Sequence, residues 1–187
     1  VWLNIADQVH VAPWGVHVTS EVADVTGIPS AKLRIETLVA NRTNAHQNCT
    51  VTSTILAPDG QVVAKVQDDL RVAPSSPPSG QRDKILASDE VNQPSQLHSG
   101  TRLVQTANLA SAKLWSLEER NRYTVLTEVS WQDKIVDRHT QKFGIRTLRF
   151  DPDHGFYLNE KPVKINGACV HQDFAGVGIG LTDSLWH

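Results

Sequence analysis

The sequence predicts an all-β protein built as an immunoglobulin-like antiparallel β-sandwich. Three observations support this fold class. Apolar and polar residues alternate with a period of two through several segments, turn-forming residues separate these segments, and no amphipathic pattern longer than about ten residues favours a helix between residues 1 and 180. About seven strands between residues 16 and 147 would fit a sandwich of two packed sheets.

The first strands are expected in residues 32–41 and 49–56, where the alternation predicts one wet face and one buried face. Residues 57–60 (APDG) supply turn chemistry, because Pro fixes φ, Asp bonds its own backbone and Gly accepts a positive φ. Residues 61–66 alternate again, so residues 49–67 are predicted to form a hairpin. The residues expected to face the core are Leu33, Ile35, Thr37, Val39, Val51, Ser53, Ile55, Val62, Ala64 and Val66.

Residues 73–99 interrupt this pattern with several prolines, serines and a glycine, and we expect a long surface loop there, because Pro donates no ladder hydrogen bond. The strand pattern returns at residues 101–109, 123–131 and 134–143. Residues 132–133 are then a tight connection between two strands.

The last segment, residues 151–187, is predicted to contain shorter elements than the sandwich. We predict a loop at residues 151–155, a small hairpin over 156–163 with Asn159 at its turn, and a short strand over 164–170. Thr182 is a plausible helix N-cap, so a strand, a glycine-bearing loop and a helix start would open an α/β unit. An isolated hairpin buries little apolar surface, and we therefore expect residues 150–187 to be weakly held.

The composition narrows the function classes. The 187 residues carry 18 Lys and Arg against 20 Asp and Glu, a net charge of −2, with no long basic run, which argues against nucleic-acid and anionic-membrane partners. No stretch of about 18 apolar residues predicts a membrane span, and no signal peptide is visible. Since Met is absent, we expect the natural protein to be longer at both ends.

Cysteine, histidine and tryptophan residues give few signals of chemistry. Cys49 and Cys169 lie in segments that read as different structural units, so we expect free thiols. Trp115 and Trp131 are interpreted as core residues in preference to sugar-stacking platforms. The scattered histidines are expected to be solvated, and neither a metal site nor a cofactor is predicted; they are His10, His17, His46, His98, His139 and His154.

The strongest local candidate for a binding site is His171 with Asp173, at the end of the last predicted strand. Separated by one residue, both side chains can face one pocket and exchange hydrogen bonds with sugar hydroxyls or bind a metal. The alternative is that His171 is an ordinary surface residue in a loop. Spacing alone leaves both readings open.

Four successive stretches of the sequence resemble glycoside hydrolase family 2, which includes β-galactosidases, β-glucuronidases and β-mannosidases. They are residues 112–125, 142–147 (KFGIRT), 155–164 (GFYLNEKPVK) and 167–173 (GACVHQD). The resemblance is dense over residues 112–187. The Cys-apolar-His sequence that ends at His171 is similar to that of β-galactosidase-like members.

The resemblance implies three domains: residues 1–13 as the tail of a jelly-roll sugar-binding-like domain, 14–148 as the sandwich, and 149–187 as the start of a catalytic (β/α)8 barrel. It implies a retaining β-glycosidase whose two catalytic glutamates lie beyond His187, so this chain would hold no catalytic residue and would act as a structural spacer. His171 and Asp173 would contact the carbohydrate substrate at the end of the first barrel strand.

A second hypothesis is a non-catalytic carbohydrate-binding or structural sandwich module. Only 6% of the residues are aromatic, and this low content favours a spacer role over sugar binding. The expected partner of the intact enzyme is a β-galactoside or related carbohydrate, without nucleic acid or membrane, and the enzyme is a possible homo-oligomer.

Overall fold

The computed structural model describes residues 5–25, 27–75, 100–167, 169 and 176. All regular structure in these residues is β-strand, and none of them forms a helix with the length and apolar character that a membrane crossing requires. The strands are β1 (Val9–Ala23), β2 (Ser30–Asn41), β3 (Gln47–Leu56), β4 (Val62–Val72), β5 (Thr101–Leu109), β6 (Tyr123–Trp131), β7 (Lys134–Phe143), β8 (Leu148–Asp151), β9 (Gly155–Leu158) and β10 (Lys161–Pro162).

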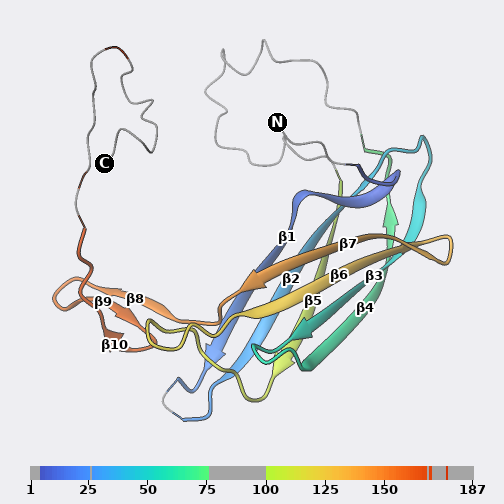
Figure 1. Ribbon diagram of the computed structural model, residues 1–187. Helices are drawn as coiled ribbons and strands as arrows, with labels where there is room; N and C mark the ends of the chain where they lie inside the picture. The colour runs from blue at the N-terminus through green and yellow to red at the C-terminus, as the bar shows by residue number, and fades with distance from the viewer. Residues whose placement is uncertain (1–4, 26, 76–99, 168, 170–175, 177–187) are drawn as a thin grey trace.

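The first seven strands form two antiparallel sheets that pack face to face (Figure 1). One sheet has the order β1-β2-β5 and the other the order β4-β3-β6-β7. Strands β4 and β5 are neighbours at one side of the sandwich, and β1 and β7 at the other. The predicted all-β class and antiparallel sandwich are confirmed.

The core lies between the two sheets and is built by the predicted alternation. In β2, Leu33, Ile35, Thr37 and Val39 are all buried, whereas Lys32 and Arg34 on the opposite face are exposed. Strands β3 and β6 contribute in the same way, since each inward position stands two residues from the next. The buried residues of these two strands are Cys49, Val51, Thr52, Ser53, Ile55, Tyr123, Val125, Thr127 and Val129.

Strand β4 differs from its prediction, because it continues to Val72 and leaves Val62 exposed. The ladder with β3 shifts between Ile55 and Leu56, which moves Val62 out of the core. Further along, Asp68 interrupts the apolar pattern and accepts a hydrogen bond of 2.9 Å from Nε2 of Gln105, on the opposite sheet. The sequence pattern therefore predicted β4 too short, because the strand carries the Asp68 carboxylate, which is hydrogen-bonded to the buried amide of Gln105.

Gln105 joins the two sheets at the side where β4 meets β5. Its Oε1 accepts a hydrogen bond of 2.7 Å from the hydroxyl of Ser53, and its Nε2 also donates to the Val51 carbonyl at 3.1 Å. Both polar side chains are buried. The amide of Gln105 and the hydroxyl of Ser53, which would be costly to bury unpaired, are thus hydrogen-bonded across the core.

Strand β1 contains a large bulge. Val11 pairs with Val39 and Val16 with Thr37, so residues 12–15 have only Leu38 opposite them. A Cβ on Gly15 would meet the Leu38 carbonyl oxygen at 2.9 Å, which explains a glycine there. The bulge turns Trp14 outward with a φ of 58° and 91% of its surface exposed.

The two tight hairpins form where the sequence predicts them. Gln132 and Asp133 connect β6 to β7, and Asn159 and Glu160 connect β9 to β10, all four with positive φ between 50° and 61°. Two consecutive residues of this kind are typical of a type I′ turn, whose twist suits adjoining strands.

Strands β8, β9 and β10 form a separate small sheet, in the order β10-β9-β8, beyond the end of β7 (Figure 1). Residues 163–167 and 169 form no strand, so the strand predicted over 164–170 is wrong at the residues that the structure describes there. Most of the loop predicted over 73–99, residues 168 and 170, and the Thr182 N-cap lie outside the described residues.

Candidate functional site

The predicted substrate-binding residues, His171 and Asp173, lie outside the described residues. The structure describes the chain that leads to them, through the small sheet and as far as Gly167. We therefore take the small sheet and its attachment to the sandwich as the candidate functional region.

The turn between β8 and β9 is organised by Asp151. Its Oδ1 accepts hydrogen bonds from the backbone amides of Asp153 at 3.0 Å and His154 at 2.9 Å, and lies 3.0 Å from Nδ1 of His154. These bonds, the contact with the His154 ring first, hold the pKa of Asp151 below its usual value. The Asp151 carboxylate therefore stabilises the turn through these hydrogen bonds, as expected for the loop predicted at residues 151–155.

One face of the small sheet is polar. Cross-strand partners share a face, so Arg149 of β8 lies beside Tyr157 of β9, with its guanidinium carbon 3.9 Å from the ring centroid. The same guanidinium group lies 3.1 Å from the Glu160 carboxylate and 3.2 Å from that of Asp151. This face is suited to contact with water.

The opposite face is mostly apolar, with Lys161 of β10 at its margin, because Lys161 pairs with Leu158. Leu148 pairs with Leu158, and Phe150 with Phe156, so these four side chains lie on one face. The two phenyl rings are 5.0 Å apart. Leu158, nearest the sandwich, is 6% exposed, whereas Phe150 is 74% exposed.

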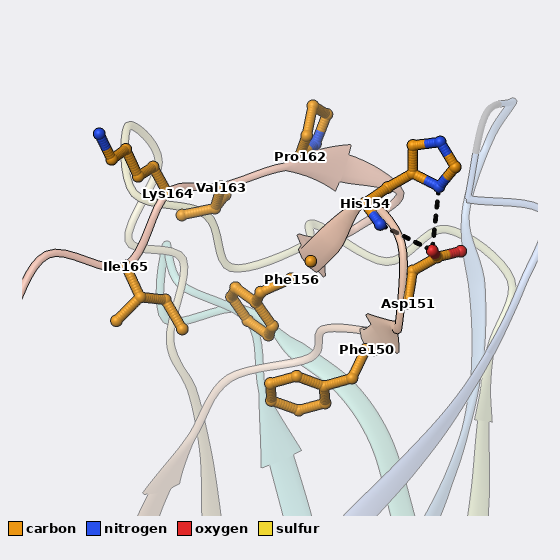
Figure 2. Close-up of a pocket in the computed structure, with 9 residues that line it drawn as sticks. Phe150, Asp151, His154, Phe156, Pro162, Val163, Lys164 and Ile165 are labelled. Carbon is orange, nitrogen blue, oxygen red and sulfur yellow. Dashed lines mark hydrogen bonds and ion pairs between the residues drawn. The ribbon is translucent and has the colours of Figure 1, made fainter.

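Beside this face is a hollow of about 660 Å³. Figure 2 shows the rings of Phe150 and Phe156 close together, with Ile165 across from them. The polar groups of its lining are few, and Asp151 among them is already engaged. The hollow therefore offers apolar contact more than acid–base chemistry; it is lined by Phe150, Asp151, His154, Gly155, Phe156, Pro162, Val163, Lys164 and Ile165.

The Asn159 side chain links the small sheet to Thr147, the residue just before β8, and to the segment between β5 and β6. Its Oδ1 accepts a hydrogen bond of 2.9 Å from the amide of Thr147, and its Nδ2 donates to the carbonyl of Trp115 at 2.9 Å. Its own amide donates to the Thr147 carbonyl at 3.0 Å. We call Asn159, Trp115 and Thr147 the joint. The expectation that residues 150–187 are weakly held stays a prediction.

Trp115 belongs to the joint and not to the core between the sheets. Its amide donates to the Ile145 carbonyl at 2.8 Å, the Arg146 guanidinium lies 5.4 Å from its ring, and Gly144 leaves room for its side chain. The prediction of a core role is therefore wrong for Trp115. It is confirmed for Trp131, which packs against the core and donates from Nε1 to Gln47 at 3.1 Å.

The prediction of solvated histidines holds for three of the five that the structure describes. His17, His46 and His154 are exposed, and His139 on β7 is half-buried. His10 on β1 is buried, and its Nδ1 has no hydrogen-bond partner. Among the described residues, no group of three or more His, Cys, Asp or Glu side chains is placed to hold a metal ion. His98 lies outside them.

Both cysteines are free thiols, as predicted. Cys49 is buried and Cys169 is exposed. Burial, and then the nearby Asp69 carboxylate, raises the pKa of the Cys49 thiol to about 11. Cys49 is therefore an inert part of the core.

Sequence reasoning identified Asn159 as a turn residue but missed the joint. Its partners lie 12 and 44 residues away in the chain, and no local pattern announces such contacts. The available signal was an asparagine at the first position of a type I′ turn, where its side chain remains free to bond elsewhere.

The chain is similar to known glycosidases over most of its length. It is 30% identical over 181 residues to the β-galactosidase BoGH2A of Bacteroides ovatus, which covers 97% of this chain and 18% of that protein. It is 26% identical over 158 residues to a β-glucuronidase of Formosa agariphila, which covers 83% of this chain and 14% of that protein. The chain thus spans less than a fifth of the length of these relatives.

Solved structures have the same fold. A glycosyl hydrolase family 2 member from Bacteroides cellulosilyticus matches with a TM-score of 0.67 and 21% identity, over 90% of this chain and 20% of that one. A β-glucuronidase from Bacteroides uniformis matches with a TM-score of 0.65 and 23% identity, over 96% of this chain and 19% of that one.

The family model described as glycosyl hydrolases family 2 matches residues 9–146, which are the seven sandwich strands and the start of the connection to the small sheet. The match covers well over half of the chain, and it agrees with the motifs read from the sequence. The chain belongs to glycosyl hydrolases family 2.

Proposed function

We propose that the intact protein is a retaining β-glycosidase, β-galactosidase-like, that hydrolyses O-glycosidic bonds in carbohydrates. The observation that carries this proposal is the 30% identity to a β-galactosidase over 97% of the chain. Membership of glycosyl hydrolases family 2 supports the reaction class.

In this proposal the chain divides at residues 13/14 and 148/149, into the tail of a preceding domain, the sandwich and the start of a catalytic barrel. The sandwich serves as a spacer that holds the barrel. Retaining hydrolysis needs two carboxylates about 5 Å apart, one as acid and base and one as nucleophile. Both are placed beyond His187, so the 187-residue chain is expected to be inactive alone.

His171 and Asp173 are proposed to bind the sugar in the intact enzyme. At the carboxyl end of a first barrel strand they would lie where barrel enzymes bind substrate. Imidazole and carboxylate groups one residue apart can hold two hydroxyl groups of one ring by directional hydrogen bonds.

A panel of nitrophenyl glycosides tests this function on the intact protein and on the 187-residue chain. We expect the intact protein to release nitrophenol from the β-galactoside and the chain to release none. In the intact protein, His171→Ala is expected to lower kcat/KM about 100-fold, the scale of one lost transition-state hydrogen bond. His46→Ala, at an exposed turn of the sandwich, is the control and should leave activity unchanged.

Turnover by the 187-residue chain would refute the assignment of the catalytic groups to the rest of the protein. An intact protein that binds sugars without cleaving any glycoside of the panel would instead favour the second hypothesis, a carbohydrate-binding module. Binding of no sugar at all would leave a structural module.

A further inference from the structure

The sequence contains one asparagine that is followed by a glycine, at Asn166 and Gly167. Asparagine is a thermolabile residue, because the backbone nitrogen that follows it can attack its side-chain amide. Glycine at the next position favours this attack, since it has no Cβ to shield the nitrogen or to restrict the backbone. Whether the two residues react depends on how the fold holds them.

Asn166 and Gly167 lie just beyond the small sheet and belong to no strand. Both residues are exposed. Within the described part of the chain, neither their backbone amides nor the Asn166 side chain makes a hydrogen bond. A Cβ at Gly167 would have no atom within 4 Å of it, so the space around the attacking nitrogen is open.

The turn between β3 and β4 contains a similar pair of residues that is held by hydrogen bonds. Asp59 and Gly60 are also exposed, but the Gly60 amide donates to the Ala57 carbonyl at 2.9 Å. Oδ1 of Asp59 accepts a hydrogen bond of 3.1 Å from the Gln61 amide. An amide that donates in a turn gives up its proton less readily and is held away from the neighbouring side chain. Hydrogen bonding, and not exposure, therefore distinguishes the two sites.

The other asparagines are less suited to this reaction. Each of them precedes a residue that has a Cβ. Asn41 and Asn159 also use both the oxygen and the nitrogen of their side chains in hydrogen bonds. Asn166 alone combines a following glycine with the absence of hydrogen bonds within the described residues.

We propose that Asn166 is a site of spontaneous modification, where the chain closes a succinimide ring with Gly167 that opens to aspartate or isoaspartate. A base in solution removes the Gly167 amide proton, the nitrogen forms a bond to Cγ of Asn166, and the side-chain nitrogen leaves as ammonia. Water then adds to one of the two ring carbonyls. Cleavage of the new bond to Cγ gives aspartate, and cleavage of the original peptide bond gives isoaspartate. No oxidant or reductant takes part.

The products differ from asparagine in charge and in backbone length. Both carry a carboxylate in place of a neutral amide, and isoaspartate also inserts a methylene group into the backbone. His171 and Asp173 follow in the sequence. An effect of the modification on sugar binding by these residues rests on the proposed function, whereas the modification itself does not.

Peptide mapping by mass spectrometry tests the proposal on the 187-residue chain, kept in parallel at pH 8 and at pH 6. A free peptide of residues 161–168 gives the rate without any fold. We expect Asn166 to deamidate in the chain within about fivefold of the peptide rate, because no hydrogen bond protects it, and faster at pH 8 because base is required. A chain that reacts more slowly than this limit would overturn the proposal.

Asp59→Asn is the matched control, because it creates a second Asn–Gly pair, at a turn whose Gly60 amide is engaged. We expect this pair to deamidate at least about tenfold more slowly than its own free peptide. A rate equal to that of the peptide would overturn the role given to hydrogen bonding. Urea unfolding, followed by tryptophan fluorescence, confirms that the sandwich is folded in each sample.

Gly167→Ala tests the ring-closing step. Alanine fits the open space, and its Cβ shields the nitrogen, so we expect deamidation of Asn166 to become about tenfold slower. Isoaspartate is expected among the products of the unchanged chain, because only a ring can give it. An unchanged rate in Gly167→Ala, or products with aspartate and no isoaspartate, would mean direct hydrolysis of the side chain and would overturn the proposed step.

Discussion

The sandwich and the small sheet of this chain are stabilised by different kinds of interaction. The sandwich buries a continuous set of apolar side chains between its two sheets, from Val9 to Ile145. The small sheet buries Leu158 among its apolar residues and leaves Phe150 exposed. Its position depends on the hydrogen bonds of Asn159.

The difference shows that two parts of one chain can depend on different kinds of contact. The sandwich has the burial that a domain needs to fold by itself, because apolar area removed from water is the main favourable contribution. A three-stranded sheet of ten residues buries much less apolar area, and hydrogen bonds and ion pairs supply more of its contacts.

The largest effect is expected for a substitution in the sandwich core. Ile35→Ala removes three methyl or methylene groups from a fully buried site of β2, and we expect the free energy of unfolding to fall by about 3 kcal/mol. Urea unfolding followed by tryptophan fluorescence measures the change. Val62→Ala, at an exposed site of β4, is the control and should change the free energy by less than about 0.5 kcal/mol. If Ile35→Ala and Val62→Ala lowered the free energy of unfolding by similar amounts, burial in the core would not be the main source of stability.

A smaller and local effect is expected at the joint. Asn159→Gly keeps the positive φ of the turn and removes both side-chain hydrogen bonds. We expect hydrogen exchange at the Thr147 amide to become about tenfold faster, which equals about 1.4 kcal/mol, while the unfolding midpoint of the sandwich stays the same.

Glu160→Gly is the matched control for the joint. Glu160 is the next residue of the same turn, also with positive φ, and its side chain contacts only the exposed polar face through Arg149. Exchange at Thr147 should be unchanged in this variant. Equal acceleration in both variants would mean that the turn, and not the Asn159 side chain, holds the sheet.

The smallest effect concerns pH and the sandwich alone. The fold raises the pKa of Cys49 from 9.0 to about 11, so the folded state favours the protonated thiol. This contribution to stability is complete below pH 9 and is lost as the pH rises through 11, by about 1 kcal/mol at pH 10.

The measurement compares Cys169→Ser with the double variant that also carries Cys49→Ala, by urea unfolding between pH 8 and pH 11. The difference between the two free energies should shrink as the pH rises, since other titrating groups are common to both proteins. A difference that stays constant would show that the Cys49 thiol is not shielded by the core.

The strands that keep strict alternation could be predicted to the residue. Strands β5, β6 and β7 have the bounds that the pattern predicts. The alternation is clearest in β6, where Tyr123, Val125 and Val129 are buried. The prediction was too short for β4, where Asp68 faces Gln105 across the sandwich. A polar pair between distant segments cannot be recognised from one of its members.

The candidate site was predictable only in part. The Asn159 turn follows from the preference of type I′ turns for asparagine, but its bonds to Thr147 and Trp115 join segments whose proximity depends on the whole fold. Trp115 was assigned to the core because large aromatic residues usually lie there, and the structure places it at the joint instead.

The bulge in β1 opposes edge-to-edge strand pairing between copies of the protein. An outer strand with a regular row of free amides can add a foreign strand and start a fibril. Here Pro13 has no amide hydrogen to offer, residues 12–15 break the repeat, and the amide of Val11 is occupied by the Asp137 carboxylate at 2.8 Å. A straightened, proline-free version of this margin would form aggregates more readily.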